Sequence, residues 1–151
     1  MTSPAALAVH PLSTDALLGG SKVLRARPGT ALEWVRLIRD GISAAAIDAL
    51  ARALKLTQSE LAHALAIPER TLARRKKEGT LNSEESAKLV RLARVVERAE
   101  EVFEDLDAAL DWLKSPNAAL AGATPLSLID TDIGAQSVTD TLGRIEHGVF
   151  A

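Results

Sequence analysis

The same short signal for a helix start occurs three times in this chain and constrains its fold more than any other feature. Each time, a side chain that can cap a helix is followed three residues later by glutamate: Thr30 and Glu33, Thr57 and Glu60, Asn82 and Glu85. In such a capping box, the first side chain accepts a hydrogen bond from the backbone N–H of the glutamate, and the carboxylate accepts one in return. The spacing therefore predicts helices that begin after residues 30, 57 and 82.

Apolar residues behind these starts recur at spacings of three and four, as they do along one face of a helix. The longest run shares one face over 83–103 and comprises Leu89, Leu92, Val96, Ala99 and Phe103. We expect further helices over 14–18, 43–54, 68–79, 126–129 and 131–146, and one that starts at Asp105 or Asp107 and ends near 113, separated mainly by glycine and proline. Ala and Leu dominate, and no stretch alternates as a half-buried strand does. The sequence therefore predicts an all-α protein.

The composition excludes several classes of protein. A hydrophobic share of 47 % in 151 residues allows a core for one domain or two small ones. The absence of cysteine excludes disulfide frameworks and cysteine zinc sites. No apolar stretch reaches the length of a membrane span, and no Lys or Arg precedes Lys22, as a signal peptide would require. We therefore expect a cytoplasmic protein without a membrane partner.

The sequence carries no pattern typical of an enzyme. His10, His63 and His147 are scattered, and none has a partner at a spacing that suits a metal ion. No glycine-rich phosphate loop follows a predicted strand. We expect no catalytic residues, no cofactor and no metal.

The stretch TQSELAHALAIPERTLARRKKEG, residues 57–79, is typical of a helix-turn-helix. Leu61, Leu65 and Leu72 would turn toward the core, and Ala62 is small where the two helices cross. The second helix carries five basic residues within eight positions, which suits a groove lined by phosphates. The net charge is −2, so any DNA contact must come from such a local patch. The alternative interpretation is a solvated basic helix.

We expect seven side chains of this motif to contact DNA. Base readers would be Arg70, Thr71 and Arg74, on the outer face near the start of the second helix. Phosphate contacts would be Gln58, Arg75, Lys76 and Lys77. Two positions depart from the generic motif: Ala66 stands where the turn often has glycine, and Arg75 where a second apolar anchor is common. The aliphatic part of Arg75 can pack against the core while its guanidinium reaches a phosphate. Alternatively, the second helix is docked differently from that of the common helix-turn-helix.

These patterns divide the chain into an N-terminal, partly helical segment (1–41), a helix-turn-helix region (42–82) and a C-terminal binding and assembly region (83–151). One helix-turn-helix covers only half of a DNA site, so we expect at least a dimer when DNA or another partner is bound. Val90, Val95 and Val102 lie off the main stripe of the long helix. That helix can therefore pack internally and also across a dimer interface.

The second half of the chain carries a series of spaced elements after its arginine-studded helix. They are Trp112-Leu113, Pro116-Asn117, Leu120, Gly122, Pro125-Leu126, Leu128-Ile129, Thr131, Gly134, Leu142, Arg144-Ile145-Glu146, Gly148, Val149 and Phe150. In this order they resemble the pattern of the Xre/MbcA/ParS-type antitoxins: WL-x-x-PN, L-x-G-x-x-P-L-x-L-(L/I), T-x-x-G and L-x-R-I-E-x-G-V-(F/Y). The upstream IPERTLARRKKEGTL is similar to the family's recognition-helix region. The resemblance covers about residues 42–151.

This resemblance implies an antitoxin that neutralises a RES-domain toxin, an enzyme that consumes NAD, and that represses its own operon by binding operator DNA. The expected toxin-binding residues are Val138, Leu142, Arg144, Ile145, Glu146, His147, Gly148, Val149, Phe150 and Ala151. Gly148 is a good helix stop, and an apolar tip beyond a rigid helix is suited to anchor a partner. The alternative interpretation is that Phe150 packs into the core of the same chain.

Two other functions fit the same regions. A plain helix-turn-helix repressor with a C-terminal dimerisation domain would have no toxin partner. A plasmid-partition or nucleoid factor would bind centromere-like repeats and would not rescue growth from a toxin.

Overall fold

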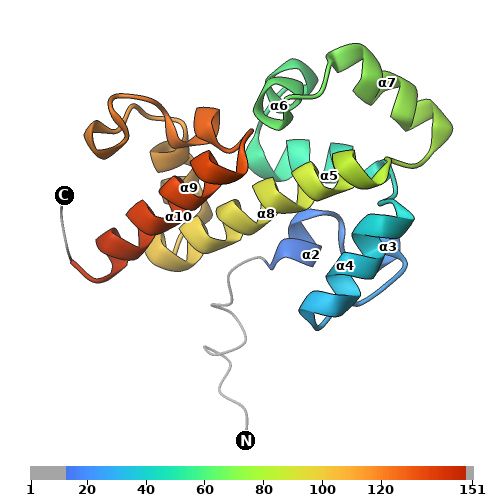
Figure 1. Ribbon diagram of the computed structural model, residues 1–151, viewed down its shortest axis with the longest axis horizontal. Coiled ribbons are helices and arrows are strands. Elements are labelled where there is room, and N and C mark those ends of the chain that lie inside the picture. The colour runs from blue at the N-terminus through green and yellow to red at the C-terminus, as the bar shows by residue number, and fades with distance from the viewer. Residues whose placement is uncertain (1–12, 149–151) are drawn as a thin grey trace, which may run out of the picture.

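The computed structural model describes residues 13–148, which form an all-α protein as the sequence predicts (Figure 1). The helices are α2 (Thr14–Leu17), α3 (Gly20–Leu24), α4 (Ala31–Asp40), α5 (Ala45–Leu54), α6 (Gln58–Leu65), α7 (Glu69–Glu78), α8 (Ser83–Phe103), α9 (Leu106–Leu113), the 3₁₀ turns η1 (Ala118–Leu120) and η2 (Pro125–Leu128), and α10 (Asp132–Glu146). Over 13–148, extended pairing is limited to one isolated bridge between Ser43 and Thr80. No helix in that range is long and apolar enough to cross a membrane.

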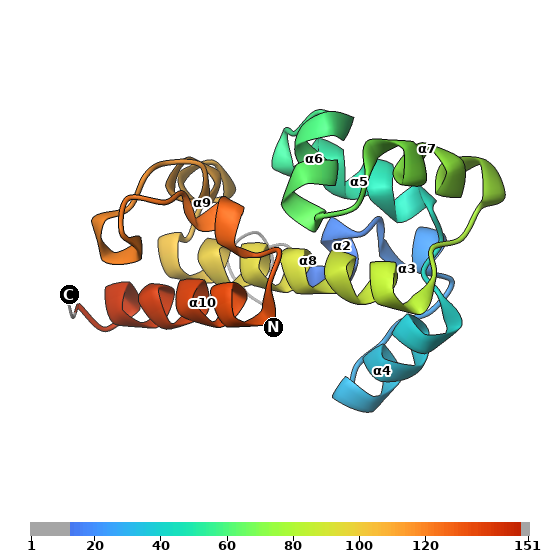
Figure 2. The ribbon, with the colours of Figure 1, turned by 45° about the horizontal axis from the view of Figure 1, so that its top comes forward.

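The long helix α8 runs through the middle of the molecule (Figures 1 and 2). The helices α5, α6 and α7 lie toward its N-terminal half, and α9 and α10 lie along its C-terminal half. Leu89, Leu92, Ala93, Val96 and Ala99 have no exposed surface. Both parts of the protein therefore share one core, built on α8.

The three predicted helix starts are confirmed, with one difference in detail. Thr57 and Asn82 form complete capping boxes with their glutamates. The Thr30 hydroxyl also accepts a hydrogen bond from the backbone N–H of Glu33. The Glu33 carboxylate, however, accepts its return bond from the N–H of Gly29, one residue earlier, at 3.1 Å.

The closing helix α10 runs beside α8 in the same direction (Figure 2). Val138 and Leu142 are fully buried. At the far end, the Arg98 guanidinium donates hydrogen bonds to both carboxylate oxygens of Glu146, including one of 3.0 Å to Oε2. Apolar packing and a two-pronged ion pair therefore fix the position of α10.

The start of α10 depends on a glycine. A Cβ atom added to Gly134 would lie 1.8 Å from the backbone oxygen of Leu128. No side chain fits where the two backbones approach so closely, which accounts for the glycine of the T-x-x-G pattern. The Thr131 hydroxyl caps the same turn by accepting the N–H of Gly134.

Replacing Leu142 by alanine should destabilise the fold by about 2–5 kcal/mol, because it opens a cavity between α8 and α10. The free energy of unfolding is measured by urea titration. Arg144→Ala, on the exposed side of the same helix, is the matched control and should change it by less than about 0.5 kcal/mol. Equal effects of the two changes would contradict the packing described.

The protein should lose stability in acid as the glutamates of its two capping boxes are protonated. Hydrogen bonds from Thr57 hold the pKa of Glu60 below its ordinary value of 4.5. Burial alone would raise the pKa of Glu85, but hydrogen bonds from Arg75 and Asn82 outweigh it and leave that pKa lowered. A carboxyl with a lowered folded-state pKa stabilises the fold above its unfolded pKa. The free energy of unfolding should therefore fall as pH drops below about 4.5.

Urea titrations between about pH 7 and pH 3 measure this loss. The double variant Glu60→Gln/Glu85→Gln keeps a side chain that suits a capping box but cannot ionise. Its stability should change less with pH than that of the unaltered protein. The same acid dependence in both proteins would show that these two carboxylates do not cause it.

Candidate DNA interface and partner-binding helix

The helices α6 and α7 form the predicted helix-turn-helix core. Leu61, Leu65 and Leu72 are buried, and Ala62 is 5 % exposed where the helices meet. The turn between them passes through Ala66, whose φ of +54° lies in the left-handed region. Alanine tolerates this conformation less well than glycine, and the Lys88 ammonium donates to the Ala66 carbonyl at 3.2 Å. A contact from α8 therefore supports the turn.

The residues expected to contact DNA fall into two groups. Arg70, Arg74 and Lys77 are exposed, and Thr71 is half-buried. The nearest acid to Arg74 is Glu78, with 4.0 Å between Nε and Oε2, which is at the limit of an ion pair. These side chains leave the cationic face of α7 accessible to a nucleic acid.

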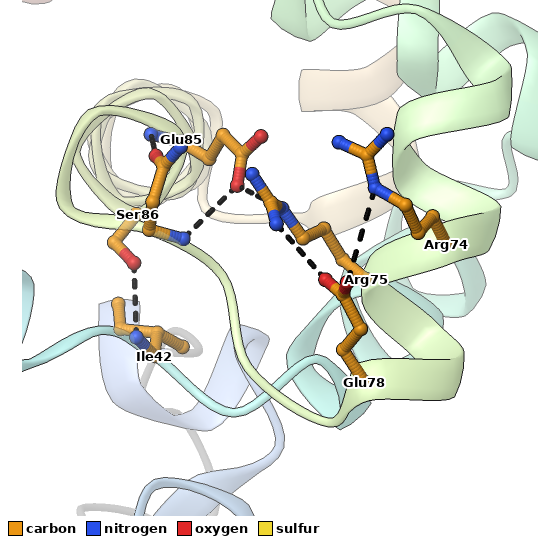
Figure 3. A network of polar contacts seen from close by, with 7 residues as sticks. Ile42, Arg74, Arg75, Glu78, Glu85 and Ser86 are labelled. Carbon is orange, nitrogen blue, oxygen red and sulfur yellow. Dashed lines mark hydrogen bonds and ion pairs between the residues drawn. The ribbon is translucent and has the colours of Figure 1, made fainter.

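The second group is held by contacts within the chain. The Gln58 amide donates to Asp48 at 3.3 Å, and the Lys76 ammonium lies 2.9 Å from the same carboxylate oxygen. The Arg75 guanidinium binds Glu85 on α8 and Glu78 on α7 (Figure 3). The polar groups of Gln58, Arg75 and Lys76 are therefore already bound to acidic side chains of the same chain and are not free to hold a phosphate.

From the sequence, Asp48 is not identified as part of this site, and Glu85 is assigned only to a capping box. Both acids lie ten or more positions along the chain from the side chains they bind, which is too far for the i, i+3 or i, i+4 pairs that a sequence shows. Such pairs become visible only when the helices are placed together. The one local hint is that Arg75 stands at an apolar position and so requires an acid nearby.

Two of the expected toxin contacts face the wrong way for that role. Val138 and Leu142 have no exposed surface, because their side chains pack against α8. This corrects their assignment: they hold α10 in place and do not offer a surface to a partner in this conformation. Ile145 is half-buried beside them.

The accessible part of the expected toxin-binding set lies at the end of α10. Arg144, His147 and Gly148 are exposed. Glu146 is engaged by Arg98, which lowers the Glu146 pKa chiefly through the side-chain hydrogen bond. Val149, Phe150 and Ala151 lie outside the described residues. Gly148 has a φ of +72°, so the chain leaves the helix direction there.

The outward side of α10 is polar apart from one apolar residue that the sequence analysis did not single out. Ile133, in the first turn of the helix, is 82 % exposed. Ile133 lies outside the apolar face formed by Val138 and Leu142. An apolar residue in that position is the one sequence signal that could have identified it. An isoleucine this exposed is available to a partner that covers the start of α10.

A groove of about 480 Å³ lies between α4 and α10, with α8 as its floor. Val90 and Val95 line it but are only 4 % and 5 % exposed. These two valines are therefore largely covered within one chain and do not require a second copy. The dimer expected from the sequence stays a prediction.

Comparisons with known proteins follow the same division of the chain. The family profile described as antitoxin Xre-like helix-turn-helix domain matches residues 33–94. The profile described as antitoxin Xre/MbcA/ParS C-terminal toxin-binding domain matches residues 98–148. These are a DNA-binding domain and a toxin-binding domain, and neither is catalytic.

Full-length similarities agree with the profiles. An antitoxin Xre from Yersinia enterocolitica is 37 % identical over 130 residues, covering 85 % of this chain and 86 % of that protein. An antitoxin Xre from Photorhabdus laumondii is 30 % identical over 76 % of this chain and 79 % of its own length. A Prs ADP-ribosylating antitoxin from a Sphingobium strain is 28 % identical over 80 % of this chain and 82 % of its own length. The chain belongs to the Xre family of antitoxins, with a helix-turn-helix DNA-binding domain and a toxin-binding domain.

Proposed function

We propose that this antitoxin inhibits a RES-domain toxin by placing its last residues in the toxin's active site, and that it represses its own operon through α7. The main support for the proposal is the way in which α10 is held against α8 and then ends. Its inner face and the Arg98–Glu146 pair fix the helix on α8, and Gly148 ends it. The apolar sequence Val149-Phe150-Ala151 follows a firmly held support.

The chemistry of the tail suits a site that holds NAD. Such a site is a cleft that needs cationic groups for the pyrophosphate. Phe150 would fill an apolar slot, contributing about 1.5–3 kcal/mol. The tail then excludes NAD by occupation and needs no chemistry of its own.

The name of one relative supports an NAD-consuming toxin. The Sphingobium protein is called a Prs ADP-ribosylating antitoxin. ADP-ribose is a part of NAD, so a toxin that transfers it and a toxin that degrades NAD both need an NAD pocket. The proposal here is the NAD-degrading toxin of the RES class, as the family resemblance implies.

The DNA-binding part of the proposal depends on the cations that remain exposed on α7. Arg70, Thr71 and Arg74 would read bases in the major groove, and Lys77 would contact a phosphate. Two copies about one DNA turn apart would bind an operator, so the protein would act as a dimer or a larger complex. The domain boundaries we propose remain 1–41, 42–82 and 83–151.

The rival function is a plain repressor without a toxin. A toxin gene adjacent to the gene for this chain separates the two, because a toxin–antitoxin module needs both genes. Co-expression of the two products and joint purification test the interaction directly. A neighbouring protein that neither slows growth nor co-purifies would favour the plain repressor.

Deleting Val149–Ala151 should abolish protection against the toxin while leaving the fold and DNA binding intact, because these residues follow the end of the packed helix. Growth and cellular NAD are measured in cells that express the toxin with each antitoxin. Ser137→Ala, which trims an exposed polar side chain on α10 that is not among the expected toxin contacts, is the control for the tail.

Three outcomes distinguish the possibilities. Growth arrest with a fall in NAD, restored by the full-length chain alone, supports the proposal. Full protection by the truncated chain would assign inhibition to α10 itself or to residues 116–129. A toxin that leaves NAD unchanged but adds ADP-ribose to a protein would contradict the NAD-degrading class.

The double variant Arg70→Ala/Arg74→Ala should lose operator specificity, because two base-reading side chains are removed. A single such contact is worth about 1–3 kcal/mol. Binding is measured on a DNA duplex from the region upstream of this gene and on an unrelated duplex. Arg52→Ala, which removes an exposed cation from α5, is the control. Unchanged operator binding by the double variant would refute the docking of α7 in the major groove.

A further inference from the structure

Apolar packing alone does not fix the helix that carries the exposed cations. Leu72 is the buried residue of α7. A residue three positions later lies on the same side of a helix, and here that residue is Arg75. The orientation of the second half of α7 must therefore depend on polar contacts.

Arg75 joins α7 to the first turn of α8 (Figure 3). Its Nε donates to Oε1 of Glu85 at 2.8 Å, and its Nη1 donates to Oε1 of Glu78 at 2.9 Å. The side chains of Arg75 and Glu85 are 21 % and 10 % exposed. A charge-assisted contact this well shielded restricts geometry more than an exposed surface pair does.

The acceptor on α8 is itself fixed. The same Glu85 oxygen accepts the backbone N–H of Asn82 at 3.0 Å, which completes the capping box of α8. The neighbouring Ser86 hydroxyl accepts the N–H of Ile42 at 2.9 Å (Figure 3). The Ile42 carbonyl in turn accepts the N–H of Leu81, in the loop between α7 and α8. One network therefore holds α7, this loop and the start of α8.

We propose that Arg75 is a positioning residue, whose pair with Glu85 sets the angle at which α7 presents Arg70 and Arg74 to DNA, and that it holds no phosphate. This inference rests on the proposed role of α7 in DNA recognition. It explains why a cation stands where helix-turn-helix motifs commonly have an apolar anchor. The Arg75 stem packs toward the core, and its head binds a carboxylate on the central helix.

Neutralising Glu85 separates the two possible roles of Arg75. A carboxylate near DNA repels phosphates, so its removal should tighten DNA binding if Arg75 is a phosphate contact held back by Glu85. If the pair positions α7, the same removal should weaken operator binding. Glutamine at position 85 still suits a capping box, so the start of α8 is preserved.

The experiment compares Glu85→Gln, Arg75→Met and their double variant, in the full chain, on the upstream duplex over a range of KCl concentrations. Glu84→Gln is the matched control, because it removes the same charge from an exposed position in the same turn. Lys77→Ala serves as the reference for a lost phosphate contact. Circular dichroism and thermal melting establish that each variant is folded.

We expect Glu85→Gln and Arg75→Met each to lower operator affinity by about 5- to 30-fold, the effect of losing one charge-assisted hydrogen bond. The double variant should be no weaker than either single variant, since both remove the same link. The slope of log affinity against log salt should stay unchanged in these variants and fall by about 0.9 in Lys77→Ala. Glu84→Gln should not weaken binding.

The proposal is overturned if Glu85→Gln binds the operator as tightly as the unaltered protein or more tightly, or if Arg75→Met lowers the salt slope as Lys77→Ala does. If Arg75→Met fails to fold, Arg75→Lys replaces it, because lysine keeps the charge but loses the forked geometry. Unaltered affinity in Arg75→Lys would also overturn the proposal. An unaltered protein that binds no upstream DNA would instead refute the proposed DNA function.

Discussion

The structure depends on the burial of one helix from several sides. Leu89, Leu92 and Val96 form the stripe that the sequence shows, while Val90 and Val95 are buried on other sides of α8. A helix that is apolar over so much of its circumference is stable only when neighbours cover more than one face. The helix-turn-helix covers one part of α8, and α9 and α10 cover another. Each half of the protein therefore completes the core of the other.

Polar contacts fix the orientations of helices that apolar packing alone does not determine. Arg75 links α7 to the start of α8, and Arg98 links the end of α10 to the same helix. The Lys114 ammonium donates to the carbonyl of Leu54 at 2.8 Å, which connects α9 to the end of α5. These contacts join segments far apart in sequence, and they orient the two surfaces on which function depends.

Local chemistry made the helices predictable. The starts at Thr57 and Asn82 follow from side chains three residues apart, and the end of α7 follows from Gly79, whose φ is +98°. The core of the helix-turn-helix followed from the spacing of leucines on two adjacent helices. These features need only neighbours within about one turn, so a single sequence suffices to identify them.

The partners of each face could not be predicted in the same way. Periodicity places Val138 and Leu142 on one side of α10, but it does not say whether that side meets α8 or another protein. The sequence places Arg75 among the DNA contacts because the more shielded of its two acidic partners, Glu85, lies on another helix. The sequence shows that α7 carries cations, but it does not show which of them form ion pairs with acidic residues on other helices.

The measurement that most directly tests a shared core on α8 is native-state hydrogen exchange of its backbone amides over increasing denaturant. The account predicts that the amides from Leu89 to Ala99 exchange only by global unfolding, with one common free energy. If the amides near Leu89 and those near Ala99 exchange with two different opening free energies, the shared core is contradicted. That result would mean that the helix-turn-helix and the toxin-binding region unfold as independent units.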